Sequence, residues 1–103
     1  MKILALEYHP PDASDDQLTE VLLRTEACRA WELHQAGVIR ELYFRADRPA
    51  AVLVLECVNV EQARQMLNTL PLVCEKLIDF ELIPLTAYPG FARLFTANEK
   101  NSI

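Results

Sequence analysis

The sequence predicts a single α+β domain in which two helices cover one face of a four-stranded antiparallel sheet. Three observations lead to this prediction. The chain has 103 residues, which is the length of one domain with one core. Short apolar runs alternate with longer segments in which apolar residues recur at helical spacing. The two halves, roughly fifty residues each, repeat similar elements, so the predicted order is β-α-β-β-α-β and the fold is ferredoxin-like.

The first half contains a strand and a long helix. Residues 2–8 form a mostly apolar run that ends before Pro10, as a strand would. Ser14 has the sequence of a capping box, which predicts a helix over 15–36. Gly37 is the expected stop, because glycine adopts the left-handed cap conformation at little cost. Apolar residues at helical spacing predict its buried face: Leu18, Val21, Leu22, Cys28 and Trp31.

The second half supplies two strands, a helix and a last strand. Residues 38–46 are rich in β-branched and aromatic side chains, and 50–58 form a nearly continuous apolar run. Asn59 is the expected cap of the second helix, and Pro71 is expected to end it. The last strand is expected over 77–85.

The chain carries more apolar residues than one small core is expected to use. They make up 51% of the sequence without glycine, whereas about 45–50% with glycine included is typical. Along 50–58 both alternating sets of side chains are apolar apart from Glu56, so neither face of this strand has the pattern of a solvated surface. Because two helices cover only one face, we expect the other face to bind a second copy of the chain, as a homodimer or higher oligomer.

Composition excludes several classes of function. The net charge is -5, which argues against nucleic acid and anionic membranes as partners. No apolar run approaches the roughly 18–20 residues of a membrane span. The three cysteines are odd in number and form no CxxC pair, so we expect reduced thiols and a cytoplasmic protein. With two glycines and two histidines without motif spacing, no cofactor-binding and no metal site is expected.

Polar residues inside the apolar patterns are the candidate site residues. A carboxylate in an apolar cleft has a raised pKa and can move protons. The alternative is that these residues form salt bridges at strand ends and along solvated helix edges. Glu7 interrupts the first strand in this way, and the other candidates are His9, Arg29, Arg40, Tyr43 and Glu56.

Short motifs in the second half resemble those of muconolactone isomerases and their relatives among the dimeric α+β-barrel proteins. The motifs are Leu-Pro-Leu at 70–72, Asp-Phe-Glu-Leu at 79–82, Leu85 and Pro89. Tyr88 stands where that family has histidine, and the segment between the first two motifs is about two residues longer here. Upstream, four further positions match at consistent spacing: Glu26, Gly37, Arg40 and Leu42.

The resemblance implies subunits that pair sheet to sheet into a closed barrel, and a cofactor-free proton shift on a small organic acid or lactone. Glu26 would carry the proton, Arg40 would hold a substrate carboxylate, and His9 is the third catalytic candidate. The expected substrate-binding residues are Arg29, Tyr43 and Glu56. Two alternatives remain open, namely a non-catalytic small-molecule-binding or regulatory module and a cofactor-free monooxygenase of the same superfamily.

Residues 1–103 are expected to form one domain with a C-terminal extension over 86–103. This extension contains three aromatic residues, Tyr88, Phe91 and Phe95, beside a proline and a glycine. The aromatic content predicts that the extension packs on the core or on a partner subunit.

Overall fold

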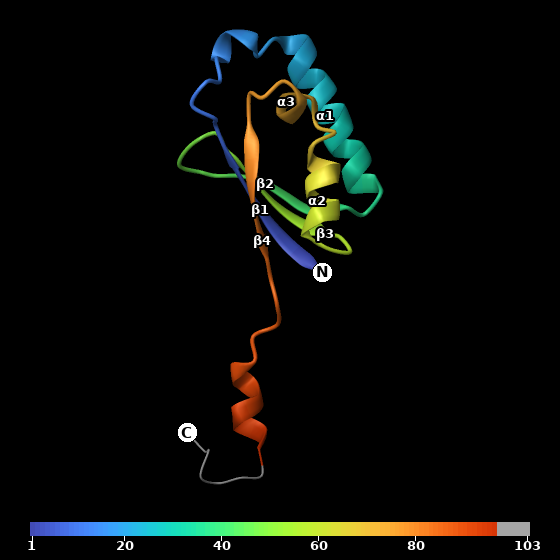
Figure 1. Cartoon of the computed structure of the whole chain (residues 1–103), viewed down its shortest axis with the longest axis vertical. Helices are drawn as coiled ribbons and strands as arrows, with labels where there is room; N and C mark the ends of the chain where they lie inside the picture. Colours follow the sequence, from blue (N-terminus) through green and yellow to red (C-terminus); the bar gives the residue numbers. More distant parts are fainter. Residues whose placement is uncertain (97–103) are drawn as a thin grey trace.

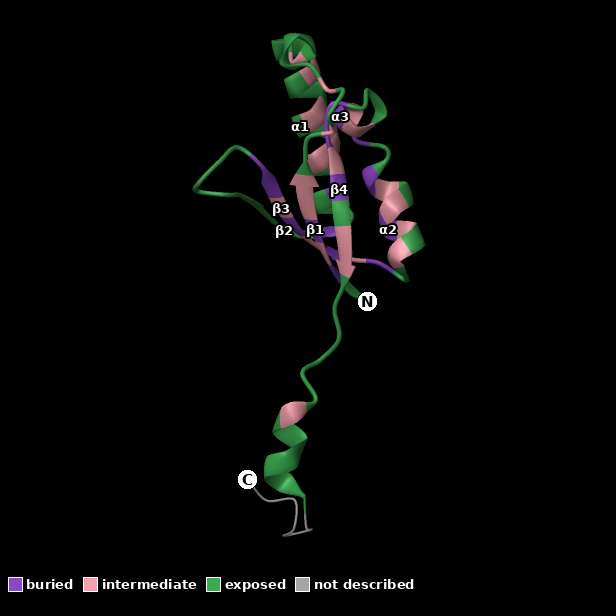
Figure 2. Cartoon of the chain, turned by 60° about the vertical axis from the view of Figure 1, so that its left-hand side comes forward, coloured by how far each residue is buried: buried purple, intermediate pink, exposed green. Residues whose placement is uncertain are grey.

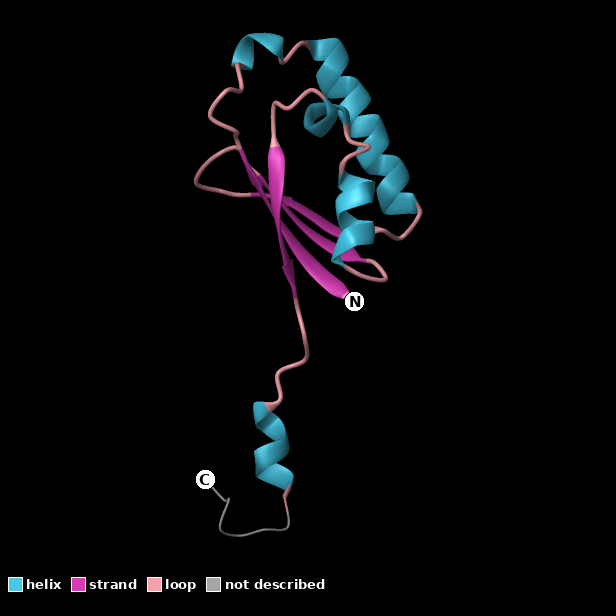
Figure 3. Cartoon of the chain, in the orientation of Figure 1, coloured by secondary structure: helices cyan, strands magenta, loops and turns pink. Residues whose placement is uncertain are grey.

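The structure is a computed structural model that describes residues 1–96, and its elements follow the predicted order (Figures 1 and 3). The strands are β1 (Lys2–Tyr8), β2 (Ile39–Phe44), β3 (Ala51–Glu56) and β4 (Asp79–Pro84). The helices are α1 (Glu20–Gln35), α2 (Val60–Leu67) and α3 (Pro71–Cys74). Two 3-10 turns, η1 (Asp15–Gln17) and η2 (Gly90–Phe95), precede α1 and follow β4.

The four strands form one sheet in the order β2-β3-β1-β4, and each strand is antiparallel to its neighbours. The central pairing places Leu4 opposite Val54 and Ala5 opposite Leu53. The three helices lie on one face of this sheet (Figure 1). The arrangement confirms the ferredoxin-like α+β fold predicted from the sequence.

The core lies between the sheet and the helices, where alternate strand residues face inward (Figure 2). In β3 the residues alternate between buried and half-buried, as a strand covered on one face requires. Leu55 in this strand and Leu67 in α2 are 0% exposed. Burying such a side chain stabilises the fold by about 1.5–3 kcal/mol. No polar or charged residue is fully buried in the described part of the chain.

The first helix begins later than predicted, so the expectation of one helix over 15–36 was wrong at its start. Ser14 caps only the short turn η1, through the N–H of Asp16. At Leu18 the backbone leaves the helical region with ψ 74. Thr19 then caps α1, because its side-chain oxygen accepts a hydrogen bond from the N–H of Leu22 at 3.2 Å. Two capping residues lie close together here, and the second one starts the long helix.

The buried face of α1 also differs from the prediction. Val21 is 77% and Trp31 59% exposed, whereas Leu33 is the buried residue of this helix. Leu18 and Leu22 of the predicted face do pack against the core, but the face towards the sheet continues through Ala30 and Leu33. Both faces satisfy the helical period, and packing of Leu33 in the core selects the one that faces inward.

Pro71 has a different role from the predicted one. Helix α2 ends at Leu67 by itself, and Pro71 is the first residue of the short helix α3. Proline is favourable at this position, because the first N–H of a helix has no partner within the helix. The backbone of Lys76 has a φ of 60, and α3 ends before it.

Gly37 ends α1 as predicted. Its φ is 83, in the left-handed region. The N–H of Gly37 donates to the carbonyl of His34, and the N–H of Val38 donates to the carbonyl of Leu33, which is the hydrogen-bond pattern of a Schellman cap. Just beyond this cap, the register between β2 and β3 shifts between Ile39 and Glu41, so Arg40 lies in an irregularity of the strand.

The last described segment extends away from the domain (Figure 1). The radius of gyration is 18.0 Å, whereas a compact chain of this length has about 13 Å. Within the segment, the rings of Tyr88 and Phe91 meet edge to face, with centroids 4.9 Å apart. Both side chains, together with Leu94 and Phe95, are exposed.

Candidate functional site

An apolar cavity of about 430 Å³ opens between α1, α3 and the inward face of the sheet. Its walls come from both helices and from all four strands, and they include Ala27, Ala30, Leu42, Leu53, Leu72 and Phe80. Two carboxylates, those of Glu7 and Glu26, also line it. A concave apolar pocket with a few convergent polar groups is the usual form of a small-molecule site.

Glu26 lies on the inward side of α1 and reaches α3. Its Oε1 accepts a hydrogen bond of 2.9 Å from the N–H of Leu72, one of the first N–H groups of α3, which lack partners within the helix. Burial raises the pKa of the Glu26 carboxyl above its usual range. The Leu72 hydrogen bond opposes this shift, and the nearby charge of Glu7 adds to it.

Glu7 was a candidate from the sequence, as a polar residue within an apolar strand, but it was assigned neither a catalytic nor a substrate-binding role. It follows Ile3 and Ala5 at alternate positions of β1, and both of these are buried in the core. Its Oε1 accepts a hydrogen bond of 2.9 Å from the N–H of Ala51, and its Oε2 lies 3.2 Å from Nε2 of His9. The side chain is 9% exposed. The sequence contained a signal for Glu7. Residues 3 and 5 of the strand are apolar and alternate, so position 7 was expected to face inward, and it carries a carboxylate.

His9 contacts the site through Glu7 rather than by lining the cavity. Its side chain is 51% exposed. Together with Arg48 and Pro49 it lines a separate hollow of about 460 Å³, to which Glu7 also contributes. Glu7 therefore lies between the apolar cavity and this outer hollow.

Tyr43 borders the cavity, but its side chain lies on the other face of the sheet, because it pairs in register with Val52, which points away from the helices. Its hydroxyl donates a hydrogen bond of 2.7 Å to the carboxylate of Glu41. This bond and the charge of Glu41 raise the pKa of the Tyr43 phenol. The side chain is 56% exposed, on the sheet face that the helices leave uncovered.

The remaining predicted residues lie outside this cavity. Arg29 donates from Nε to Oγ1 of Thr69 at 2.9 Å, and it pairs with Glu32 at 3.1 Å. The contact with Thr69 connects α1 to the segment that follows α2, whereas the pair with Glu32 lies within α1. Arg29 therefore has structural partners on the surface, and it is not among the residues that line the cavity.

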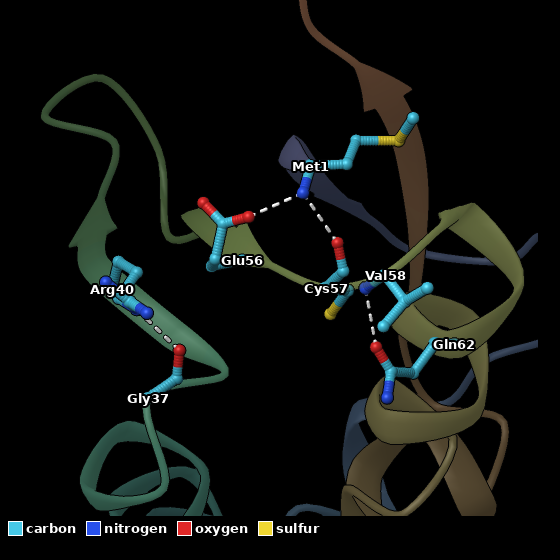
Figure 4. A network of polar contacts seen from close by, with 7 residues as sticks. All are labelled: Met1, Gly37, Arg40, Glu56, Cys57, Val58 and Gln62. Atoms are coloured by element: carbon cyan, nitrogen blue, oxygen red, sulfur yellow. Dashed lines mark hydrogen bonds and ion pairs between the residues drawn. The ribbon is translucent and has the colours of Figure 1, made fainter.

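Arg40 and Glu56 lie close to each other at the end of the sheet near the N-terminus (Figure 4). Arg40 donates from Nε to the carbonyl oxygen of Gly37 at 2.6 Å. Glu56 accepts a hydrogen bond of 2.5 Å from the terminal ammonium of Met1, which also donates to the carbonyl of Cys57 at 2.8 Å. The terminal ammonium, with help from the charge of Arg40, lowers the pKa of the Glu56 carboxyl. The structure thus brings Glu26 and, through Glu7, His9 together, and it separates them from the side chains of Tyr43, Arg40 and Glu56.

A larger hollow of about 550 Å³ beside α2 is a weaker candidate. Its opposite charges, Arg64 and Asp79, are paired with each other at 2.7 Å. A second guanidinium nitrogen of Arg64 donates to the carbonyl of Phe80 at 2.6 Å. These groups are engaged in holding α2 to β4, whereas the carboxylates of the apolar cavity face its interior.

Within residues 1–96 no three side chains of histidine, cysteine, aspartate or glutamate are arranged to hold a metal ion. In the same part of the chain, no helix has the length and hydropathy needed to cross a bilayer.

Comparison with known proteins agrees with the fold and with the sequence motifs. No curated protein matches the sequence. Among solved structures, the crystal structure of muconolactone isomerase has a TM-score of 0.69 and 26% sequence identity, over 86% of this chain and 92% of that chain. The family model for muconolactone delta-isomerase matches residues 3–90, a range that contains both carboxylates of the cavity. The chain therefore belongs to the muconolactone delta-isomerase family.

Proposed function

We propose that this protein catalyses a cofactor-independent proton shift within a small unsaturated lactone or organic acid bound in the apolar cavity. The observation that carries the proposal is the position of Glu26, whose carboxyl lines the cavity and has a pKa raised by burial. A carboxyl tuned in this way keeps its proton closer to neutral pH and exchanges it during a reaction.

The size and chemistry of the cavity support a small carbonyl compound as the substrate. A volume of about 430 Å³ falls in the range of roughly 300–1,000 Å³ that is usual for small-molecule sites. The apolar walls suit a carbon ring, and the relative of known structure is a muconolactone isomerase. This relationship and the carboxyl group in the cavity together support the proposed reaction class.

The test is an isomerisation assay with two unsaturated γ-lactones, muconolactone and the uncharged α-angelica lactone, followed by proton NMR. We expect migration of the double bond in at least one of them. Glu26→Gln should lower kcat/KM by about 10²–10⁴-fold, the usual contribution of an acid–base residue. Glu32→Gln, on the same helix but with a side chain 57% exposed, is the matched control. Wild-type protein that converts neither lactone would refute the proposal.

Other outcomes of this assay identify the alternative functions. Binding of a lactone without conversion would indicate a non-catalytic binding module, and oxygen consumption with a phenolic substrate would indicate a monooxygenase. Arg40 is tested in the same assay. We expect Arg40→Ala to retain the rate with the uncharged lactone, because Arg40 is not among the residues that line the cavity. A loss confined to muconolactone would assign Arg40 to the substrate carboxylate.

We also propose that two copies pair through the sheet face that the helices leave uncovered. Alternate residues on this face are apolar and half-buried within one chain, namely Leu4, Leu6, Val52, Val54 and Ile83. A contiguous apolar face of this kind supports association with a self-complementary partner. The C-terminal segment, whose four large apolar side chains are exposed, is proposed to pack on a partner subunit.

A further inference from the structure

Glu7 lies where a strand of this kind normally has an apolar residue. In β1 it follows two inward-facing residues, Ile3 and Ala5, which are 0% exposed. It pairs in register with Phe80 of β4, which is 2% exposed. A carboxylate at such a position costs free energy unless it has partners, so its contacts indicate what it does there.

The partners of Glu7 hold it in a fixed position. One carboxylate oxygen accepts the N–H of Ala51 at the start of β3, at 2.9 Å. The other lies 3.2 Å from Nε2 of His9. When His9 carries a proton on Nε2, both oxygens act as acceptors, as those of an ionised carboxylate do. The contact with His9 leads from the cavity wall to a side chain that is 51% exposed to solvent.

Glu26 has the complementary environment on the opposite wall. In residues 1–96 its carboxyl accepts one hydrogen bond, from the N–H of Leu72. The charge of Glu7 is one of the causes that raise the pKa of Glu26. Two carboxylates that face one apolar cavity favour a state in which one is ionised and the other keeps its proton. Glu7 has two hydrogen-bonding partners and Glu26 has one, so the geometry favours Glu7 as the group that accepts a proton and Glu26 as the group that delivers one.

We propose that Glu7 is a second catalytic carboxylate, which removes a proton from the bound lactone while Glu26 delivers one to another carbon of the same molecule. The C–H bond next to the lactone carbonyl breaks, and its proton goes to Glu7. The electron pair shifts along the conjugated carbons, and a new C–H bond forms with the proton of Glu26. Transfer of the proton from Glu7 back to Glu26 restores both groups, so no oxidant, reductant or cofactor is consumed. This assignment rests on the proposed function.

The two carboxylates also favour an uncharged substrate. They are the charged side chains that line the cavity in the described part of the chain. An anionic ligand would be repelled by the ionised group in an apolar medium, where such interactions are strong. The proposal therefore assigns unsaturated lactones and related neutral carbonyl compounds as the preferred substrate class, and α-angelica lactone should have a higher kcat/KM than muconolactone.

The two roles are separated by carrying out the reaction with α-angelica lactone in deuterium oxide. Proton abstraction then appears as deuterium incorporated next to the carbonyl, and isomerisation appears as the moved double bond. Glu7→Gln should lose both signals by about 10²–10⁴-fold. Glu26→Gln should keep deuterium incorporation while isomerisation falls by a similar factor. Glu61→Gln, an exposed residue on α2, should retain both.

The outcomes distinguish this assignment from the proposed function. An active wild type with an unaffected Glu7→Gln variant would overturn the role of Glu7 and leave the proposed function intact. An inactive wild type would refute the proposed function and the catalytic role of Glu7 with it. ¹³C NMR titration of the Glu26 carboxyl tests separately whether the two carboxylates interact across the cavity. If this titration is the same in wild type and Glu7→Gln, they do not interact and the assignment is wrong, whereas a titration that moves to lower pH in the variant supports their interaction.

Discussion

The hydrogen bond between Glu26 and Leu72 joins α1 to α3, and two substitutions of Glu26 separate its contribution to stability from that of its charge. Glu26→Ala removes the acceptor for the Leu72 N–H, which is bound at 2.9 Å. An unpaired, partly buried N–H costs about 1–3 kcal/mol, so we expect the free energy of unfolding to fall by this amount. Glu26→Gln keeps an oxygen acceptor at the same place and should cost less than about 1 kcal/mol.

The pH dependence of stability should also differ between wild type and Glu26→Gln. Burial raises the pKa of Glu26 in the folded protein above its ordinary value of 4.5. The folded state therefore binds this proton more tightly than the unfolded state, and the stabilisation is complete below pH 4.5. It is lost as the pH rises through the raised folded-state pKa. Glutamine does not titrate, so the variant lacks this loss and gains stability relative to wild type on going from acid to neutral pH.

Urea denaturation followed by circular dichroism, at about pH 4.5 and about pH 8, measures both effects. With a urea m-value of about 1–3 kcal/mol/M, the cost of Glu26→Ala corresponds to a midpoint lower by about 1 M. All samples must have one protein concentration, because the proposed pairing of two copies would contribute to apparent stability. Equal midpoints for the alanine and glutamine variants would refute the role of the hydrogen bond. Parallel pH profiles for wild type and Glu26→Gln would refute the effect of burial on the carboxyl.

Two further predictions concern the sheet face and the helix cap. Val54→Glu puts a charge on the uncovered sheet face and should reduce the sedimentation coefficient of the proposed oligomer to that of a monomer. Val58→Glu is the control, because this position is already 77% exposed, and it should leave the sedimentation coefficient unchanged. If Val54→Glu sediments like wild type, that face is not the interface. Gly37→Ala forces alanine to a φ of 83 and should lower stability by about 1–2 kcal/mol. An unchanged Tm would contradict the left-handed cap.

The features predicted correctly from the sequence depend on neighbouring residues. The order of strands and helices follows from local periodicity, and Gly37 ends α1 because only its own backbone conformation matters. Helix boundaries at which two residues could each act as the cap were predicted less well. Ser14 and Thr19 both have capping side chains, and the sequence does not say which of them starts the long helix.

The site required information on tertiary packing. Which stripe of α1 faces the sheet depends on Leu33, and the same rotation of the helix brings Glu26 to the cavity. Arg40 was matched to the same site from its position in the sequence. The shift in register of β2 between Ile39 and Glu41, together with its hydrogen bond to Gly37, holds Arg40 elsewhere. Short motifs carry no information about such a shift.

Apolar residues that the core does not use lie at two places, the uncovered sheet face and the cavity. An interface through the sheet face would account for only the first. Pairing through the uncovered sheet face would bury side chains such as Val54, which point away from the helices. Leu23, Leu42 and Phe44 lie on the other side, at the cavity, and are 46%, 49% and 71% exposed. Sheet-to-sheet pairing does not reach them, because they face the helices. Their exposure around two inward-facing carboxylates is therefore an argument for a bound small molecule that is independent of the oligomer.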